Sequence, residues 1–153
     1  MIRAFGAALL LSLGMVACQS APAGAAKEKV ATAPLEIRTP GKTHKFRVEV
    51  ARTGEQQARG LMFRESLAQG TGMIFPFKPP RPASFWMKNT VIPLDMIFIR
   101  ADGTIAMIAA DTIPYSLDPV GTAEPVAAVL EIAGGEAARL GISEDDKVVW
   151  KDK

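Results

Sequence analysis

Short segments in which apolar and polar residues alternate recur along most of this chain, and they constrain its fold more than any other feature. In 46–50 (FRVEV) every second residue is apolar, which is the period of a strand with one face buried. Helical patterns are limited to 53–62 and 134–140. Further strand-like segments are 35–37, 84–87, 94–100, 104–109, 126–132 and 147–150.

Seven or eight short strands and two short helices, without regular strand–helix alternation, favour a mostly β (α+β) fold. We therefore expect a single compact antiparallel β-sandwich or barrel; periodicity does not choose between the two. Asp102-Gly103 predicts a tight hairpin, and Thr53 with Gln56 predicts a capping box at the start of the first helix. Gly141 is expected to end the second helix. Four prolines within 76–82 predict an ordered loop over a sheet edge.

Residues 1–17 have the pattern of a signal peptide. Arg3 supplies a positive charge, and 7–13 (AALLLSL) is an apolar stretch too short to span a bilayer as a helix. Residues 18–34 are rich in Ala, Pro and polar side chains without periodicity, which predicts a flexible tether. The folded domain is expected over 35–151, in an exported protein of the periplasm and cell envelope.

Cys18 is the only cysteine, and small residues precede it as in a bacterial lipobox, although Met15 stands where leucine is usual. Lipidation would make Cys18 the mature N-terminus and would remove an unpaired thiol from an oxidising compartment. We therefore expect a membrane-anchored lipoprotein. The alternative is ordinary cleavage between Ala25 and Ala26, which would give a soluble periplasmic or secreted protein.

Composition argues against several classes of partner. Lys and Arg number 18 against 16 Asp and Glu, and no basic stripe is interleaved with aromatics, so nucleic acid is not an expected partner. No His or Cys cluster has zinc spacing, and the scattered methionines are better explained as core filling than as copper ligands. We expect no metal and no cofactor.

The segment 85–96 is unusual because Lys88, Asn89 and Asp95 interrupt the most hydrophobic part of the chain. One hypothesis is a polar pocket in which Lys88 binds an anionic or hydroxylated ligand and Asp95 accepts hydrogen bonds from it. The structural alternative is a corner between two strands, with Asn89 and Asp95 bonding nearby backbone. Trp86, if exposed, would border this pocket and stack on a sugar ring or pack against a partner.

Three further charged residues are candidates for the same site. Arg59 and Arg64 flank the end of a predicted helix, where their guanidinium groups could clamp a carboxylate or phosphate. Glu131 lies in a strand between Leu130 and Ile132. If Glu131 faces inward it needs a partner, for which Arg59, Arg64 and Lys88 are candidates; otherwise it faces solvent.

Enzymatic chemistry has little support. His44, the only histidine, is expected on the surface, and no serine lies in a nucleophile elbow. A hydrolase that uses Asp95 and Glu131 as an acid–base pair is the alternative function, and a purely structural envelope protein is a further one. Our main hypothesis is a protein that binds a small polar ligand or an envelope protein through Arg59, Arg64, Trp86, Lys88, Asn89, Asp95 and Glu131.

Four motifs occur in order in this chain: ARGLMFRESL (58–67), GMIFPF (72–77), FWMKNTVIPLDMIFI (85–99) and VLEIAGGEAARLGI (129–142). Together they closely resemble the DUF192 family, a widespread prokaryotic family of uncharacterised proteins, over about 35–150. The resemblance implies a compact β-rich domain, often exported, and it implies no established activity. Family members often have Gly-Asp before the last strand, where this chain has Asp145-Asp146, so the local turn type there is open.

Overall fold

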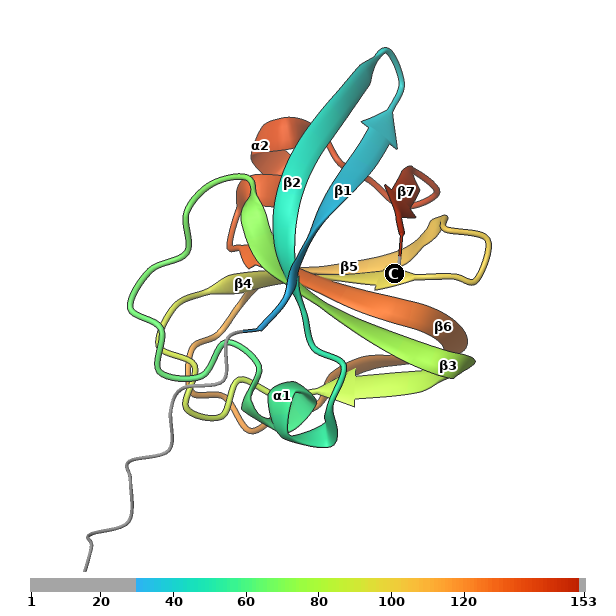
Figure 1. Ribbon diagram of the computed structural model, residues 1–153. Coiled ribbons are helices and arrows are strands. Elements are labelled where there is room, and N and C mark those ends of the chain that lie inside the picture. The colour runs from blue at the N-terminus through green and yellow to red at the C-terminus, as the bar shows by residue number, and fades with distance from the viewer. Residues whose placement is uncertain (1–29, 152–153) are drawn as a thin grey trace, which may run out of the picture.

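A seven-stranded sheet organises residues 30–151, which are the part of the chain that the computed structural model describes (Figure 1). Across the sheet the strand order is β5-β4-β6-β3-β2-β1-β7. All neighbours pair antiparallel except β2 and β3, which are parallel. The elements are β1 (Thr32–Thr39), β2 (Lys42–Val50), α1 (Gly54–Arg59), β3 (Thr71–Phe85), β4 (Leu94–Ile99), β5 (Ile105–Thr112), β6 (Val120–Ala133), α2 (Glu136–Leu140) and β7 (Lys147–Trp150).

The sheet curls until its two edge strands meet. Thr104, just before β5, forms an isolated antiparallel bridge with Lys147 of β7. Beside it, the Val148 amide donates to the Gly103 carbonyl at 2.8 Å, and the Ile105 amide donates to the Asp146 carbonyl at 2.9 Å. The predicted mostly β fold with two short helices is therefore confirmed, and the open choice between sandwich and barrel resolves to one curled sheet, a half-barrel.

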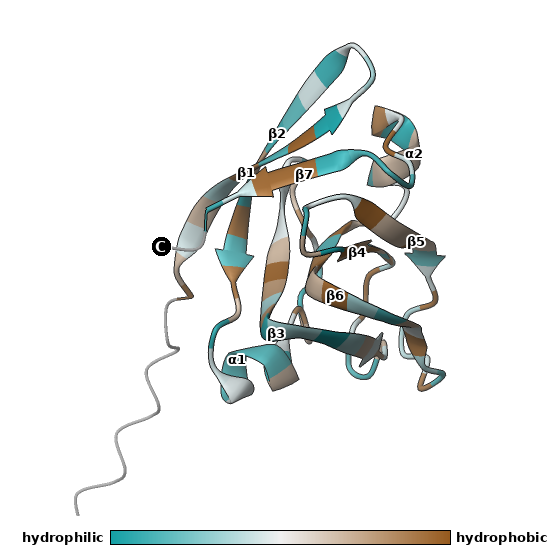
Figure 2. Ribbon diagram, turned by 90° about the vertical axis from the view of Figure 1, so that its right-hand side faces the viewer, coloured by the Kyte–Doolittle hydropathy of each residue, from teal (hydrophilic) through white to brown (hydrophobic). Residues whose placement is uncertain are grey.

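Apolar side chains cover both faces of the three central strands β3, β4 and β6. In register across these strands, Ile74, Ile97 and Leu130 point to the face covered by β1, β2 and β7. The next residues along, including Phe75 and Phe98, belong to a second cluster on the opposite face. Successive side chains along each strand point to opposite faces of the sheet. This alternation is visible as bands along β2 in Figure 2. A polar residue on a central strand is therefore buried whichever face it takes.

The two helices begin and end largely where the sequence predicts. The Gln56 amide donates to Thr53 Oγ1 at 3.1 Å and the Thr53 amide donates to Gln56 Oε1 at 3.2 Å, so the capping box is present. Helix α1 stops at Arg59, earlier than predicted, because the backbone turns at Gly60 with φ 48°. Helix α2 ends at Gly141, which has the left-handed conformation expected of a C-terminal glycine.

The proline-rich segment 76–82 is part of strand β3, so the predicted loop is wrong. The β3–β6 pairing continues through it with register shifts between Pro76 and Arg81 and between Arg81 and Ala83. Prolines are tolerated there because the ladder is interrupted at those positions. The expected strand 84–87 is the end of β3, which stops at Phe85.

The Asp95 carboxylate, fully buried on β4, joins three segments through backbone amides. Its Oδ1 accepts hydrogen bonds from the amides of Asp111 at 2.9 Å and Gly135 at 3.0 Å. Its Oδ2 accepts one from Ala137 at 2.8 Å. Donors on the end of β5 and at the start of α2 are thereby satisfied by one side chain of β4. Asp95 therefore fixes α2 against the sheet.

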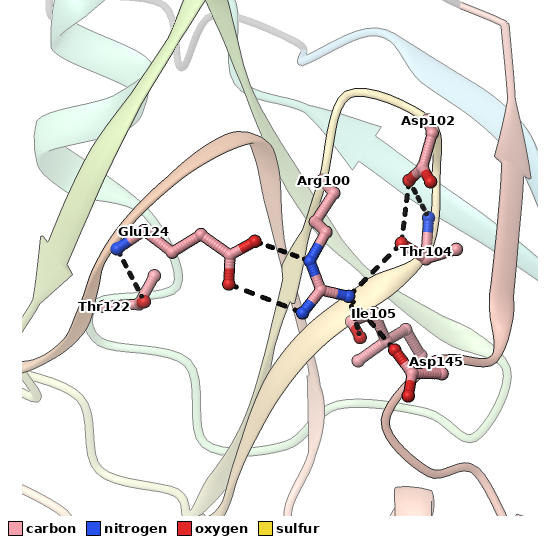
Figure 3. A network of polar contacts seen from close by, with 7 residues as sticks. All are labelled: Arg100, Asp102, Thr104, Ile105, Thr122, Glu124 and Asp145. Carbon is pink, nitrogen blue, oxygen red and sulfur yellow. Dashed lines mark hydrogen bonds and ion pairs between the residues drawn. The ribbon is translucent and has the colours of Figure 1, made fainter.

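A second polar network joins the hairpin β4–β5 to β6 and to the turn before β7 (Figure 3). Arg100 donates to both carboxylate oxygens of Glu124, at 2.6 and 3.4 Å, and to Asp145 Oδ1 at 3.2 Å. Asp145 has φ 67°, a conformation in which glycine is favoured. The turn type that the sequence left open at Asp145-Asp146 is therefore one with a left-handed residue at Asp145, whose carboxylate also accepts from Arg100.

Asp95→Ala should lower the free energy of unfolding by about 2–3 kcal/mol, because it leaves the buried amide of Ala137 and the part-buried amides of Asp111 and Gly135 without their acceptor. Chemical denaturation of the variant against wild type measures this. Asp118→Ala, which removes an exposed aspartate side chain, is the control and should change stability by less than about 0.5 kcal/mol. An Asp95→Ala protein as stable as the control would contradict the role given to this carboxylate.

Candidate functional site

A pocket of about 360 Å³ opens on the face of the central strands that is not covered by β1 and β7. One wall is the end of α1 with the turn that follows it, and the other is the outer half of β3 with the loop that precedes β6. The pocket is lined by Gln57, Ala58, Arg59, Gly60, Leu61, Met62, Phe75, Phe77, Arg81, Ser84, Phe85, Trp86, Thr90, Leu117, Pro119 and Glu131.

Glu131 is the acidic residue of this lining, and the sheet register places it at the pocket base. Its Cα partners are Met73 on β3 and Met96 on β4, so it lies between two buried thioether side chains. The residue is 5% exposed, and its carboxylate has no hydrogen bond or ion pair with any other residue of 30–151. Buried carboxylates are normally hydrogen-bonded or paired. Glu131 therefore has unused hydrogen-bonding capacity directed at the pocket.

Burial raises the pKa of the Glu131 carboxyl to about 8, and the charge of Arg64 opposes only part of that rise. The charge of Arg64 lowers the pKa of Glu131 only slightly because Arg64 is already paired. Its guanidinium donates to both carboxylate oxygens of Glu49, at 2.6 and 2.7 Å. That hydrogen bonding also raises the pKa of Arg64. Of the two alternatives for Glu131, the inward-facing one holds, but among the described residues none of the candidate partners Arg59, Arg64 and Lys88 hydrogen-bonds to it, and Glu131 is predominantly neutral at pH 7.

The corner at 86–90 holds the rim of the pocket together. Asn89 has φ 55°, which turns the chain sharply after β3, and its carbonyl accepts a hydrogen bond from the Phe63 amide at 2.8 Å. On the other side, the Met87 amide donates to the Ser116 carbonyl at 2.9 Å. The turn after α1 and the loop 113–119 are thereby both attached to this corner through backbone atoms, whereas the Asn89 side chain contacts the Met62 sulfur rather than nearby backbone.

Trp86 is 51% exposed, and its ring borders the pocket mouth. The Lys88 ammonium lies 5.1 Å from the centre of the Trp86 ring, a cation–π distance. Deeper in, Phe85 packs edge-on against Phe75 with ring centres 5.1 Å apart. Of the two adjacent aromatics at 85–86, Phe85 is thus the core residue and Trp86 is the one available to a ligand.

The structure brings together three of the seven residues predicted for the site and separates the rest. Arg59, Trp86 and Glu131 line one pocket. Lys88 is exposed beside Trp86 but outside the lining, and Asn89 is half-buried behind the rim with its amide 3.8 Å from the Met62 sulfur. The remaining two, Arg64 and Asp95, are committed to Glu49 and to backbone amides respectively.

The hydrolase hypothesis based on Asp95 and Glu131 is wrong. Asp95 is in register with Ile132, whereas Glu131 is in register with Met96, so the two carboxylates point to opposite faces of the sheet. His44, which the sequence placed on the surface, is 6% exposed because it shares the inward face of β2 with Phe46 and Val48. Neither an acid–base pair nor the histidine reaches the pocket.

Sequence reasoning missed most of the pocket's walls. Arg81 and Phe77 were hidden by the proline pattern, which predicted a loop; in fact the Arg81 guanidinium stacks 4.1 Å above the Phe77 ring. Leu117 and Pro119 belong to a loop without regular periodicity, so no pattern could place them. The usable indication was the aromatic spacing on the two sides of the prolines, Phe75-x-Phe77 and Phe85-Trp86.

The described residues offer neither a metal-binding cluster nor a helix that could span a membrane. Within 30–151 no group of three or more His, Cys, Asp or Glu is arranged to hold a metal ion. In the same range, no helix has the length and apolar character needed to cross a membrane. The expected signal peptide and the lipidation of Cys18 fall on residues 1–29, outside the described range.

Several solved structures are similar to this fold, including the following two. A Sinorhizobium meliloti 1021 protein called a "putative transcription regulator" superposes with a TM-score of 0.79 at 40% identity, covering 82% of this chain and 98% of that one. A protein of unknown function from Novosphingobium aromaticivorans DSM 12444 superposes with a TM-score of 0.78 at 47% identity, covering 91% of this chain and 99% of that one. No curated protein matches the sequence.

The sequence comparison agrees with the structural one. The profile of the DUF192 family, described as "Uncharacterized ACR", matches residues 35–150. That range contains every strand from the middle of β1 to β7, both helices and the whole pocket lining. The chain belongs to the DUF192 family.

Proposed function

We propose that this protein binds a small polar ligand in the pocket based on Glu131. The observation that carries the proposal is a carboxyl group that is 5% exposed, lines a cavity of about 360 Å³ and has no partner among the described residues. A ligand that hydrogen-bonds the Glu131 carboxyl would gain a contact worth about 0.5–1.5 kcal/mol.

The protonation state of Glu131 limits which chemical groups on a ligand can bind it. Since its pKa is about 8, the neutral carboxyl at pH 7 presents one O–H donor and a carbonyl-type acceptor side by side. A hydroxyl or an amide on the ligand can both donate to and accept from such a group. A ligand amine would instead draw the proton from Glu131 and form an ion pair with it.

The walls favour a ligand with a flat or ring-shaped body. Phe75, Phe77 and Phe85 supply apolar sides, while Trp86 stands half-exposed at the mouth. Stacking on such a ring is a common way to hold a sugar or another ring. Arg59 and Arg81 at the lining add donors for an anionic substituent. A hydroxylated ring with an acidic substituent could hydrogen-bond Glu131, stack on the aromatic side chains and pair with the arginines.

Binding explains the pocket better than hydrolysis does. Acid–base hydrolysis uses two carboxylates that flank the reacting bond. Glu131 is the sole carboxylate among the described lining residues, and Asp95 is sequestered on the other face. We infer a binding protein of the cell envelope, exported by its N-terminal segment and held at a membrane by a lipid on Cys18, with its ligand-binding domain at the end of a short tether.

A panel of monosaccharides, uronic acids, amino sugars and amino acids should contain compounds that quench or shift the fluorescence of Trp86. Because the chain has two tryptophans, the measurement uses a Trp150→Phe background so that Trp86 alone reports. Glu131→Gln should weaken a hit by about tenfold, the effect of 1.4 kcal/mol from one hydrogen bond to a buried polar group.

Glu144→Gln makes the same chemical change on an exposed glutamate and should leave the affinity unchanged. If every hit binds equally to the Glu131→Gln and Glu144→Gln proteins, the pocket assignment is wrong.

Stability should fall as pH rises from about 5 to 8 in a way that depends on Glu131. The carboxyl has its pKa raised to about 8 in the folded protein, so the folded state holds a proton that the unfolded chain has released above its ordinary pKa of 4.5. Wild type should therefore lose stability relative to Glu131→Gln by up to about 1.4 kcal/mol per pH unit. Urea unfolding of both proteins across this range measures the difference, and parallel curves would contradict the buried, neutral carboxyl.

Mass spectrometry of the mature protein from membranes of the expressing bacterium should find an acylated N-terminal Cys18. Cys18→Ser should release the protein from the membrane fraction, because the thiol is the acylation site. A mature chain that begins with a free Ala26 would instead show ordinary cleavage and a protein without a lipid anchor.

A further inference from the structure

All the large hydrophobic side chains exposed within residues 30–151 lie at one end of the molecule. They are 51–73% exposed, and they lie together rather than scattered singly, which is the arrangement that marks an interaction surface. We call them the apolar rim: Phe63, Trp86, Ile113, Tyr115 and Leu117.

The apolar rim is carried by three segments that hydrogen bonds join to one another. The amide of Phe63, in the turn after α1, donates to the Asn89 carbonyl at 2.8 Å. The amide of Tyr115 donates to the Thr90 carbonyl at 3.1 Å. Residues distant in sequence are thus held together as one surface around the pocket mouth, which Trp86 and Leu117 also line.

Two rim aromatics are held in a backbone conformation that disfavours them. Phe63 has φ 62° and Tyr115 has φ 63°, in the left-handed region where Gly, Asn and Asp are favoured over bulky residues. Such conformations persist when the surrounding structure imposes them, and they concentrate at functional positions. Folding alone would be served better by asparagine at both positions, so their aromatic side chains require another explanation.

The chain leaves the domain at the same end. The Ala31 carbonyl accepts a hydrogen bond from the amide of Val50, four residues before α1 begins. In both views the start of the described chain lies on the half of the molecule that carries α1, away from the tip of the β1–β2 hairpin (Figures 1 and 2). A flexible stretch of the length of 18–30 has an average span of roughly 20 Å. A lipid on Cys18 would therefore keep this end close to the bilayer.

We propose that the apolar rim docks on a lipid bilayer surface, as a second membrane contact besides the lipid that we propose on Cys18. Trp and Tyr are the residues enriched where protein meets the headgroup region, and Phe, Ile and Leu on adjacent loops supply apolar area that leaves water on insertion. The charges at this end offset one another, with Lys88 and Arg59 on one side and the exposed Glu65 and Asp118 of the rim segments on the other, so the apolar side chains carry the contact. Docking turns the pocket mouth toward the membrane, so its ligand would come from that surface.

Vesicle flotation with a fragment of residues 27–153 tests the rim without any lipid anchor. The fragment is justified because a solved relative consists almost wholly of this domain, with 98% of that chain covered. It should float with phosphatidylcholine vesicles, and also with vesicles that include anionic phosphatidylglycerol, because apolar side chains carry the contact. The triple variant Phe63→Asn/Ile113→Ser/Tyr115→Asn should reduce the partition coefficient by at least about tenfold, the effect of keeping one large apolar side chain in water.

Two controls make the outcome decisive. The triple variant avoids every residue of the pocket lining and puts asparagine at the two left-handed positions, so its melting temperature should not fall. A Lys42→Ser/Thr43→Asn variant, changed at the exposed hairpin of the opposite end, should float like wild type. Absence of flotation by wild type, or equal flotation by the triple variant, would overturn the proposal. So would a rim-dependent dimer in analytical ultracentrifugation without flotation, which would assign this surface to a second copy of the chain.

Discussion

The three hydrogen bonds accepted by Asp95 are the interaction on which the arrangement of this fold depends most. They bring the end of β5 and the start of α2 to one buried carboxylate on β4. Asp95 and Glu131 lie on neighbouring strands, in adjacent register pairs, yet their environments are opposite. Asp95 faces a cluster of backbone amides that satisfies it, whereas Glu131 faces a cavity that does not. Asp95 therefore stabilises the fold, whereas Glu131 is available to a ligand.

The same sheet explains how a pocket forms in so small a domain. Because the central strands are covered on both faces, the second face needs its own cover, which α1, the 86–90 corner and the loop before β6 provide. These segments meet through a few backbone hydrogen bonds rather than through a continuous sheet. The space they leave against the sheet is the cavity at Glu131, and the side chains they turn outward form the apolar rim.

Local sequence patterns predicted most helices, strands and turns. The pairing of strands, and with it the positions of the site residues, depends on tertiary contacts. Strand alternation, the capping box at Thr53 and the Asp102-Gly103 hairpin depend on neighbours in sequence, so the residues alone revealed them. The prolines of 76–82 wrongly predicted a loop, because β3 continues through this segment and its pairing with β6 is interrupted there by register shifts. For the site, residue type indicated Trp86 and Glu131, but only register could show that Asp95 and Glu131 point to opposite faces. The loop that contributes Leu117 had no pattern by which to place it.

The most direct test of this account is an NMR titration of the Glu131 side-chain carboxyl carbon, assigned by its loss in Glu131→Gln. A buried carboxyl without a partner predicts a midpoint at about pH 8 in the free protein. It also predicts a change in that midpoint when a pocket ligand is present, because the ligand would supply the missing hydrogen bond or charge. A midpoint near 4.5, unaffected by any ligand that binds the protein, would show that Glu131 is solvated or paired and would contradict the assignment of the pocket.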